Sequence, residues 1–338
     1  GLFMTYGLPL IAANAIYQLM PFLNRGAIAA SAGFAEAGYF SLAADLGLRV
    51  FVGRRQAIVS TTDPAPVGFA ALAERAVACG CLAIGPAMGG TEAAEAVRTE
   101  PLLGALIHAG LLHHATFQAA LAYRFSLKLA SGEMSEQILR EIADDAHARA
   151  PALAEAAQAD LEAVYERDPA SHRLMQPMLF FKGFQALQAY RIAHWLWNND
   201  RRDMAYFVQM RCSEVFGVDI HPGARIGTGV MLDHAHSIVI GETAVVGNDV
   251  SMLHSVTLGG TGKGNGDRHP KIEDGVMIGA GAKVLGNIRV GHHSRIAAGS
   301  VVLSDVPHCK TVAGVPARVV GDAGCAAPST AMDQLLKD

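Results

Sequence analysis

Aliphatic residues recur every six residues along the last third of the chain. The period holds over two runs separated by a gap, at Ile220, Ile226, Leu232, Ile238, Ala244, Val250 and Val256, and then at Ile272, Ile278, Val284, Val290, Ile296 and Val302. Glycines directly follow several of these positions, where a tight corner favours a residue without a side chain. Hexapeptide repeats of this kind are typical of a parallel β-helix, in which three hexads form one triangular coil.

The gap between the two runs predicts a loop at 257–271. From Val256 to Ile272 is sixteen residues, four more than two hexads, so the chain must leave the coil. The stretch LGGTGKGNGDRHPK contains five glycines and returns through Arg268, His269 and Pro270. A cation and a titratable ring where a loop rejoins a rigid scaffold favour a functional loop over a tolerated surface insertion.

Upstream of the hexads, apolar residues recur at intervals of three and four. This pattern extends over about residues 91–215 and predicts a bundle of amphipathic helices, with Thr91 and the acids at 92 and 95 marking a helix start. Aromatic residues at helical spacing in 178–201 indicate core packing or a subunit interface rather than a ligand site.

Residues 1–90 have a different character. The segment 1–24 carries no charge and is long enough to cross a bilayer as a helix. Pro9 and Pro21 would kink or end such a helix, and no basic segment precedes it as in a secretory signal. Two interpretations stay open for the first 50 or so residues, a packed apolar extension or a membrane-associating segment, and a linker is expected up to residue 90. Residues 322–338 are expected to form a C-terminal tail.

Composition narrows the class of partner. Apolar residues make up 51% of the 338 residues, charged residues 17%, and the net charge is -4. This balance argues against disorder and against nucleic-acid binding, and favours a small-molecule partner. The five cysteines are scattered and contain no C-x-x-C pair, which disfavours a disulfide framework or a zinc ribbon. We expect a cytoplasmic protein without a bound metal.

A second polar cluster lies in VDIHP (218–222) and LDHAHS (232–237). Asp219 and His234 are fifteen residues apart, nearly one coil of three hexads, so we expect them on successive layers of the same edge. A carboxylate that orients an imidazole gives a general base for a hydroxyl group, as acyl transfer requires. The segment also allows metal binding by His234, His236 and His254.

These motifs resemble those of the bacterial serine O-acetyltransferases. The similarity covers about residues 92–321 and rests on VDIHPGARIGTGVMLDHAHS, on GGTGK followed by GDRHPK, and on YERDPA and FFKGFQALQAYRIAHWLW in the helical part. It implies an α+β protein, with an N-terminal α-helical domain at 91–215 and a left-handed parallel β-helix at 216–321. The implied reaction transfers the acetyl group of acetyl-CoA to L-serine, giving O-acetyl-L-serine for cysteine biosynthesis.

The resemblance assigns His234 as the base, supported by Asp219. His269 would contact the substrate from across the pocket and share in proton transfer. Serine would be acetylated by direct attack on the thioester, without an acyl-enzyme, and a backbone N–H near Gly259 and Gly260 would meet the oxyanion.

The remaining assignments concern binding. Arg268 would hold the serine carboxylate, Asp168 and Asp233 would hold the ammonium group, and Glu242 would lie beside this site. Coenzyme A would lie between adjacent β-helices of a trimer, with its pantetheine amides against the backbone at the small residues Gly260, Ala280 and Ala298.

The resemblance also implies assembly and regulation. Members of this family are trimers through the β-helix and commonly hexamers through the helical domains, and cysteine inhibits many of them. Many dock a C-terminal isoleucine into O-acetylserine sulfhydrylase, a partnership that is not expected for this chain because its sequence closes with AMDQLLKD.

Three other functions stay open at this point. One is a hexapeptide acetyltransferase that acts on a sugar or an amine, although a sugar needs no arginine aimed at a carboxylate. Another is a zinc-binding β-helix of the carbonic anhydrase type. The third is a non-enzymatic scaffold or membrane-tethered module, which rests on the apolar N-terminal stretch alone.

Overall fold

The computed structural model describes residues 90–262, 264–324 and 326–335. The chain divides into two compact units between Thr116 and Phe117. The expected N-terminal extension and linker lie outside the described residues except for Gly90, and the domain boundaries given above stay a prediction. Among the helices in the described ranges, none is both long and apolar enough to cross a lipid bilayer.

The described part of the first unit is a series of short helical segments. These are α4 (Gly90–Thr99), η2 (Pro101–Leu103), α5 (Gly104–Ile107) and the π-helical turn η3 (His108–Leu112). The expected helix from Thr91 onward is interrupted before Pro101, because a proline has no N–H to donate and clashes with the preceding helical turn. Pro101 instead starts the next turn, where its missing N–H is tolerated.

Helices also form the beginning of the second unit, in agreement with the predicted bundle. They are α6 (Phe117–Leu129), α7 (Glu136–Arg149), α8 (Ala152–Arg167), α9 (Met175–Phe180), α10 (Lys182–Asn198) and α11 (Arg202–Phe216). α10 lies at the centre, with Phe184 and Tyr190 of the aromatic segment buried. Gly217 ends α11 in the left-handed region, at φ 68°, and turns the chain into the first strand.

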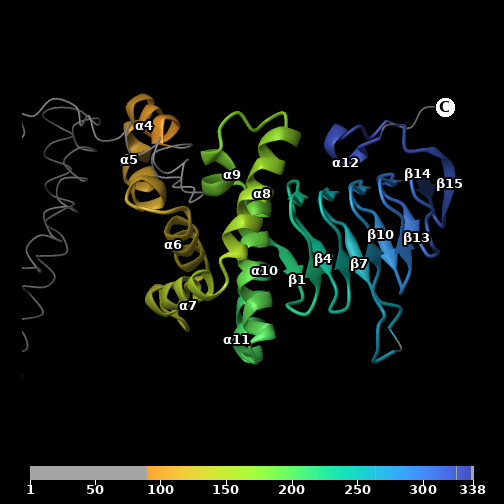
Figure 1. The fold of residues 1–338 in the computed structure, drawn as a ribbon, viewed down its shortest axis with the longest axis horizontal. Helices are drawn as coiled ribbons and strands as arrows, with labels where there is room; N and C mark the ends of the chain where they lie inside the picture. The colour runs from red at the N-terminus through yellow and green to blue at the C-terminus, as the bar shows by residue number, and fades with distance from the viewer. Residues whose placement is uncertain (1–89, 263, 325, 336–338) are drawn as a thin grey trace, which may run out of the picture. The chain divides into compact units, whose positions relative to one another are not determined.

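The predicted parallel β-helix is confirmed, with about five turns. Its strands form three sheets, which we name sheet A (β1-β4-β7-β10-β13), sheet B (β11-β8-β5-β2) and sheet C (β15-β14-β12-β9-β6-β3). Only the last pair, β14 and β15, is antiparallel within the described residues. In Figure 1 the strands of sheet A lie side by side, with α10 and α11 next to β1.

The strands are short, and each ends at a corner of the coil. Their bounds are β1 Val218–Ile220, β2 Arg225–Ile226, β3 Met231–Leu232, β4 Ile238–Ile240, β5 Val245–Val246, β6 Ser251–Met252, β7 Thr257–Gly259, β8 Lys271–Ile272, β9 Met277–Ile278, β10 Lys283–Leu285, β11 Arg289–Val290, β12 Arg295–Ile296, β13 Val301–Val302, β14 Lys310–Gly314 and β15 Ala317–Asp322. A short helix, α12 (Pro328–Ala331), follows and packs on α8 and β9.

The single register expected for the aliphatic positions is wrong in two places. Val218 pairs with Ile238, whereas Val239 pairs with Thr257, so the first coil is longer than the second by two residues. These two extra residues fall in the corner between β3 and β4. Val246 pairs with Ile272, so the coil that contains the loop is longer than a regular coil by eight residues rather than four.

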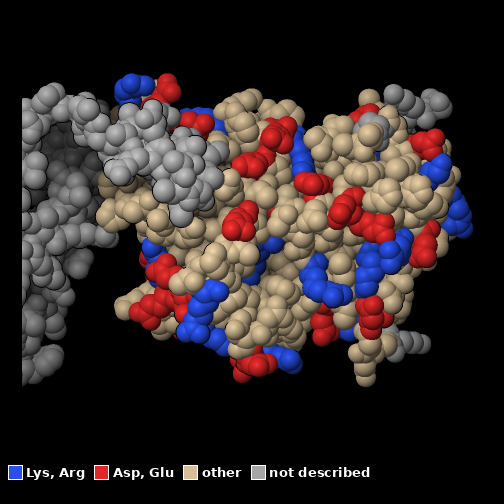
Figure 2. Space-filling view, in the orientation of Figure 1, with Lys and Arg blue, Asp and Glu red and all other residues tan. Residues whose placement is uncertain are grey.

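The helices are fixed to the first coils by buried polar contacts. The carboxylate of Asp160 in α8 accepts hydrogen bonds from Arg191 Nε (2.8 Å), from Gln188 Nε2 (3.0 Å) and from the backbone N–H of Val230 (3.0 Å). Arg167, the last residue of α8, donates to the carbonyl of Gly229 at 2.9 Å. These bonds place α8 over the corner that precedes β3. On the face shown in Figure 2, basic and acidic side chains are interspersed over the helices and the β-helix.

Candidate active site

The corner between β3 and β4, residues 233–237, carries the expected base, and we call it the His234 corner. His234, Ala235 and Ser237 have positive φ values of 54°, 56° and 59°. Residues with a Cβ adopt this conformation at some cost in energy, and such positions concentrate at functional sites. The two extra residues of the first coil therefore form a tight corner, which leaves the side chain of His234 76% exposed.

One carboxylate lies beside this imidazole, and a second lies near the first. Asp233 Oδ1 is 3.7 Å from His234 Nε2, and Asp168, which directly follows α8, is close enough for its charge to act on Asp233. Burial raises the pKa of Asp233, the nearby His234 opposes this change, and the negative charge of Asp168 adds to it. A pair of carboxylates that disfavour each other's charge is a suitable place for a cation such as an ammonium group.

The His234 corner continues along the β-helix as a row of small residues. The ring of His254 lies 6.0 Å from the ring of His234, edge to face. The carbonyl of His254 accepts from Gly281 N at 2.9 Å, and the carbonyl of Ala280 accepts from Gly299 N at 2.8 Å, so Ala280 and Ala298 stack above His254 on the same corner. These alanines leave the backbone of the row accessible to close approach by a ligand.

The second group of expected residues lies at the other end of β4. We define the His269 corner as residues 241–243, which follow β4, together with residues 268–270, where the loop rejoins the coil. His269 Nδ1 is 3.2 Å from Thr243 N and 2.9 Å from Thr243 Oγ1. Its ring lies against Gly241, where any Cβ would come within 2.0 Å of Nε2. Burial and then the charge of Arg268 lower the pKa of His269.

Arg268 is paired with an acid in this state. Its Nη2 lies 2.6 Å from Glu242 Oε2, and this hydrogen bond is the main reason that the pKa of Glu242 is lowered. Gly260 lies against the His269 corner, because a Cβ there would be 3.4 Å from both Arg268 Cγ and His269 Nε2. A substrate carboxylate would have to replace Glu242 at the guanidinium group.

Asp219 is placed differently from the expectation. Because the first coil holds two extra residues, Asp219 pairs laterally with Val239 of β4, and it lies in the middle of β1 on sheet A. Its Oδ1 accepts from Gln209 Nε2 at 2.6 Å, and its charge acts on His221. Within the described residues, the hydrogen bonds and ion pairs of Asp219 do not reach His234.

The expected residues thus separate into two sets at opposite ends of β4. Asp168 and His234 act on Asp233 at one end, and Arg268 acts on Glu242 and His269 at the other. Sequence reasoning missed Thr243 and Gly241, which hold the ring of His269. The available signal was their position in the GET turn, on the same corner as the returning loop.

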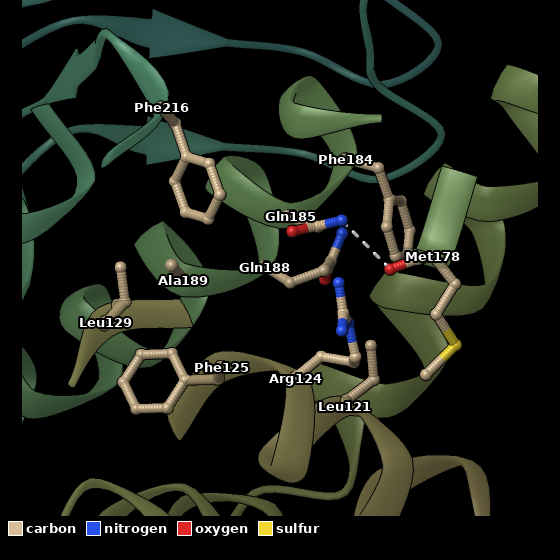
Figure 3. Close-up of a pocket in the computed structure, with 10 residues that line it drawn as sticks. All are labelled: Leu121, Arg124, Phe125, Leu129, Met178, Phe184, Gln185, Gln188, Ala189 and Phe216. Atoms are coloured by element: carbon tan, nitrogen blue, oxygen red, sulfur yellow. Dashed lines mark hydrogen bonds between the residues drawn. The ribbon is translucent and has the colours of Figure 1, made fainter. Parts of the chain in front are cut away.

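A pocket among α6, α9, α10 and α11 is separate from both sets (Figure 3). Its empty volume is about 320 Å³, and its lining is mostly apolar, with Phe125, Phe184 and Phe216 around it. Part of its polar lining is bonded within the protein, since Arg124 donates to the carbonyl of Leu179 and Gln185 donates to that of Met178. None of the site residues expected from the sequence is among those that line it.

Within the described ranges, no group of three or more His, Cys, Asp or Glu side chains is placed to hold a metal ion, and this includes His234, His236 and His254.

Known protein families match both the helical part and the β-helix of this chain. The family model for the N-terminal part of serine acetyltransferases matches residues 90–189, and the model for six bacterial transferase hexapeptide repeats matches residues 269–304. The serine acetyltransferase of Salmonella typhimurium is 56% identical over 243 residues, which cover 72% of this chain and 89% of that protein. The chain belongs to the serine acetyltransferase family.

Solved serine acetyltransferases share the fold. The enzyme from Brucella abortus in complex with coenzyme A is 53% identical, with a TM-score of 0.68, and the match covers 70% of this chain and 94% of that one. A serine acetyltransferase in complex with cysteine is 49% identical, with a TM-score of 0.72, and the match covers 73% and 96%. The resemblance inferred from the motifs is therefore confirmed.

Proposed function

We propose that this protein transfers the acetyl group of acetyl-CoA to the hydroxyl group of L-serine, giving O-acetyl-L-serine and coenzyme A. Membership of the serine acetyltransferase family supports the reaction. The observation that carries it is the exposed imidazole of His234 beside the carboxylates of Asp233 and Asp168. Such a group can bind an amine while it takes a proton from a neighbouring hydroxyl.

The division of the residues over two corners supports a site shared between copies. In one chain the carboxylate-binding Arg268 lies across sheet A from His234. A three-fold arrangement of triangular β-helices would bring the His234 corner of one copy to the His269 corner of the next. Val239, in the middle of β4, is 39% exposed in the single chain and would be covered in such a trimer. We propose a trimer, with hexamers forming through the helical part.

In the assembled site each subsite would have one chemical role. Arg268 would exchange Glu242 for the serine carboxylate, and Asp233 and Asp168 would hold the ammonium group. His234 would remove the hydroxyl proton as the serine oxygen attacks the thioester carbonyl, and the leaving coenzyme A thiolate would then be protonated. Asp219, from the middle of sheet A, would support the imidazole of His234 across the interface.

Acetyl-CoA is the second substrate. The row of small residues at Ala280 and Ala298 supports a pantetheine path along the His234 corner, and Gly260 would approach the same ligand from the neighbouring copy.

Cysteine presents the same carboxylate and amine as serine, so we propose that it inhibits by occupying the serine site. The free thiols of Cys212 and Cys309 fit a reducing compartment, which supports the cytoplasm as the place of action.

The test is coenzyme A release by metal-stripped protein with acetyl-CoA and L-serine, a simple sugar acceptor or no acceptor. We expect release to require L-serine, to survive chelation, and to fall by about 10²- to 10⁴-fold in His234→Ala. His308→Ala, on a different corner, is the matched control and should keep its activity. Release that needs a sugar, or that returns only with zinc, would contradict the proposal.

A further inference from the structure

The contacts of His269 fix which of its ring nitrogens carries the proton. The backbone N–H of Thr243 points at Nδ1 over 3.2 Å. A backbone N–H can only donate, so Nδ1 must offer its lone pair. A neutral His269 therefore carries its single proton on Nε2, and that nitrogen is a donor.

The hydroxyl of Thr243 strengthens this assignment. Thr243 Oγ1 accepts from the backbone N–H of Arg268 at 3.0 Å and from that of His269 at 3.1 Å. Both of its lone pairs are then used, so it cannot also accept from a proton on His269 Nδ1, and its own hydrogen is shared between the Asp267 carboxylate and His269 Nδ1, which lies at 2.9 Å. One side chain thus fixes the tautomer of the ring and the backbone that carries it.

The surroundings leave Nε2 free for a ligand. Two glycines lie beside this nitrogen, since a Cβ would come 2.0 Å from Nε2 at Gly241 and 3.4 Å from it at Gly260. Within the described residues Nε2 has no hydrogen-bond partner. A donor in this position, next to the guanidinium of Arg268, can bind an oxygen of a carboxylate or an oxyanion without giving up its proton.

The charges around the ring favour its neutral form. Burial, Arg268, Lys271 and His221 all lower the pKa of His269, and only Glu242 raises it. Because the pKa is lowered, the ring is protonated only at a lower pH than an ordinary histidine, and it is neutral near pH 7.

We propose that Thr243 is a positioning residue that holds His269 as a neutral Nε2–H donor, so that His269 binds substrate oxygens and takes no part in proton removal. This inference rests on the proposed acetyl transfer to serine. It separates the two histidines by role. His234 is exposed and accepts the proton, whereas His269 is held and donates a hydrogen bond.

The tautomer is measured directly by ¹⁵N NMR of the substrate-free trimer labelled on histidine, with His269→Gln used to assign the resonance. At about pH 7.5 we expect a neutral ring protonated on Nε2. A ring protonated on Nδ1, or an imidazolium, overturns the proposal. This measurement needs no turnover, so a wild type that releases no coenzyme A with serine would refute the proposed function and leave the tautomer result standing.

Steady-state kinetics test whether His269 acts as a hydrogen-bond donor that Thr243 positions. In Thr243→Val we expect kcat/KM for serine to fall by about tenfold, and Thr243→Ser, which keeps the hydroxyl, should stay within about threefold of the wild type. His269→Gln places an amide N–H near the position of Nε2 and should retain more activity than His269→Asn or His269→Ala. Equal losses of activity in all three His269 variants would show that the ring must exchange a proton, and would overturn the proposal. A Thr243→Val variant with the tautomer and the kcat/KM of the wild type would also overturn it.

Discussion

At the His234 corner two extra residues tighten the turn into β4, whereas at the His269 corner eight extra residues leave the coil and return to it. The first corner is supported by the helices, through the bonds of Asp160 and Arg167 to Val230 and Gly229, which precede β3 in the same coil. The second is held by the loop's own contacts with Thr243. The proposed base and the proposed ammonium-binding carboxylates lie at the tight corner, and the proposed carboxylate-binding Arg268 lies where the loop returns. Substrate binding would therefore use both corners, whereas proton removal would depend on the first alone.

The largest expected change in activity comes from mixing two inactive variants. This experiment tests whether the two corners form a site within one chain or between chains. His234→Ala and Arg268→Ala should each be nearly inactive. Random trimers of the two, made by coexpression, should recover about a quarter of wild-type activity, since a site is intact only when each corner comes from the copy that retains it. The measurement is serine-dependent coenzyme A release by the purified mixed trimers.

A same-corner mixture is the control. His234→Ala with Asp233→Ala places one defect in every His234 corner, so no activity should return in any arrangement. Should neither mixture recover activity while both variants assemble normally, the site would lie within one chain, and the two corners would have to approach each other by movement of the loop.

The comparison also shows what the sequence could predict. The coil was predictable because its inward positions are aliphatic at a fixed period. The register was not, because each strand segment has two inward positions, and Ile238 and Ile240 are both fully buried. A slip of two residues leaves the hydrophobic pattern intact but moves Asp219 opposite Val239 instead of Ser237, and so farther along the coil from His234. The division of the site over two corners follows from that register, and so it could not be derived from spacing.

Breaking the support of the His234 corner should have the next largest effect. Asp160 is fully buried and satisfies Arg191, Gln188 and Val230, so Asp160→Ala leaves a buried guanidinium group without its partner. We expect the free energy of unfolding to fall by about 3–5 kcal/mol. Urea denaturation measures this loss. In Asp160→Ala, amide hydrogen exchange should accelerate more at residues 228–236 than at 241–243. The reason is that α8 is bonded to Gly229 and Val230, beside the first of these segments.

Asp144→Ala is the matched control for this change. Asp144 pairs with Arg140 on the exposed surface of α7, and exposed pairs of this kind contribute about 0.3–0.5 kcal/mol. Equal losses in the two variants would mean that the buried network does not anchor the corner.

The smallest effect concerns the two carboxylates of the His234 corner. Since burial and the charge of Asp168 raise the pKa of Asp233, this group takes up its proton at a higher pH than an ordinary aspartate as the pH falls. Asp168→Asn removes one of the two causes, so the titration midpoint of Asp233 should move to lower pH. Burial should still keep this midpoint from falling far below the ordinary value.

Carbon-13 NMR of labelled aspartate carboxyl groups in substrate-free protein follows the titration, with Asp233→Asn to assign the resonance. His269 should titrate at the same pH in both proteins, because Asp168 does not act on the distant corner. If the titration midpoint of Asp233 is the same in Asp168→Asn as in the wild type, the two acids do not share one cation. The ammonium group of serine would then have Asp233 as its only carboxylate on this corner.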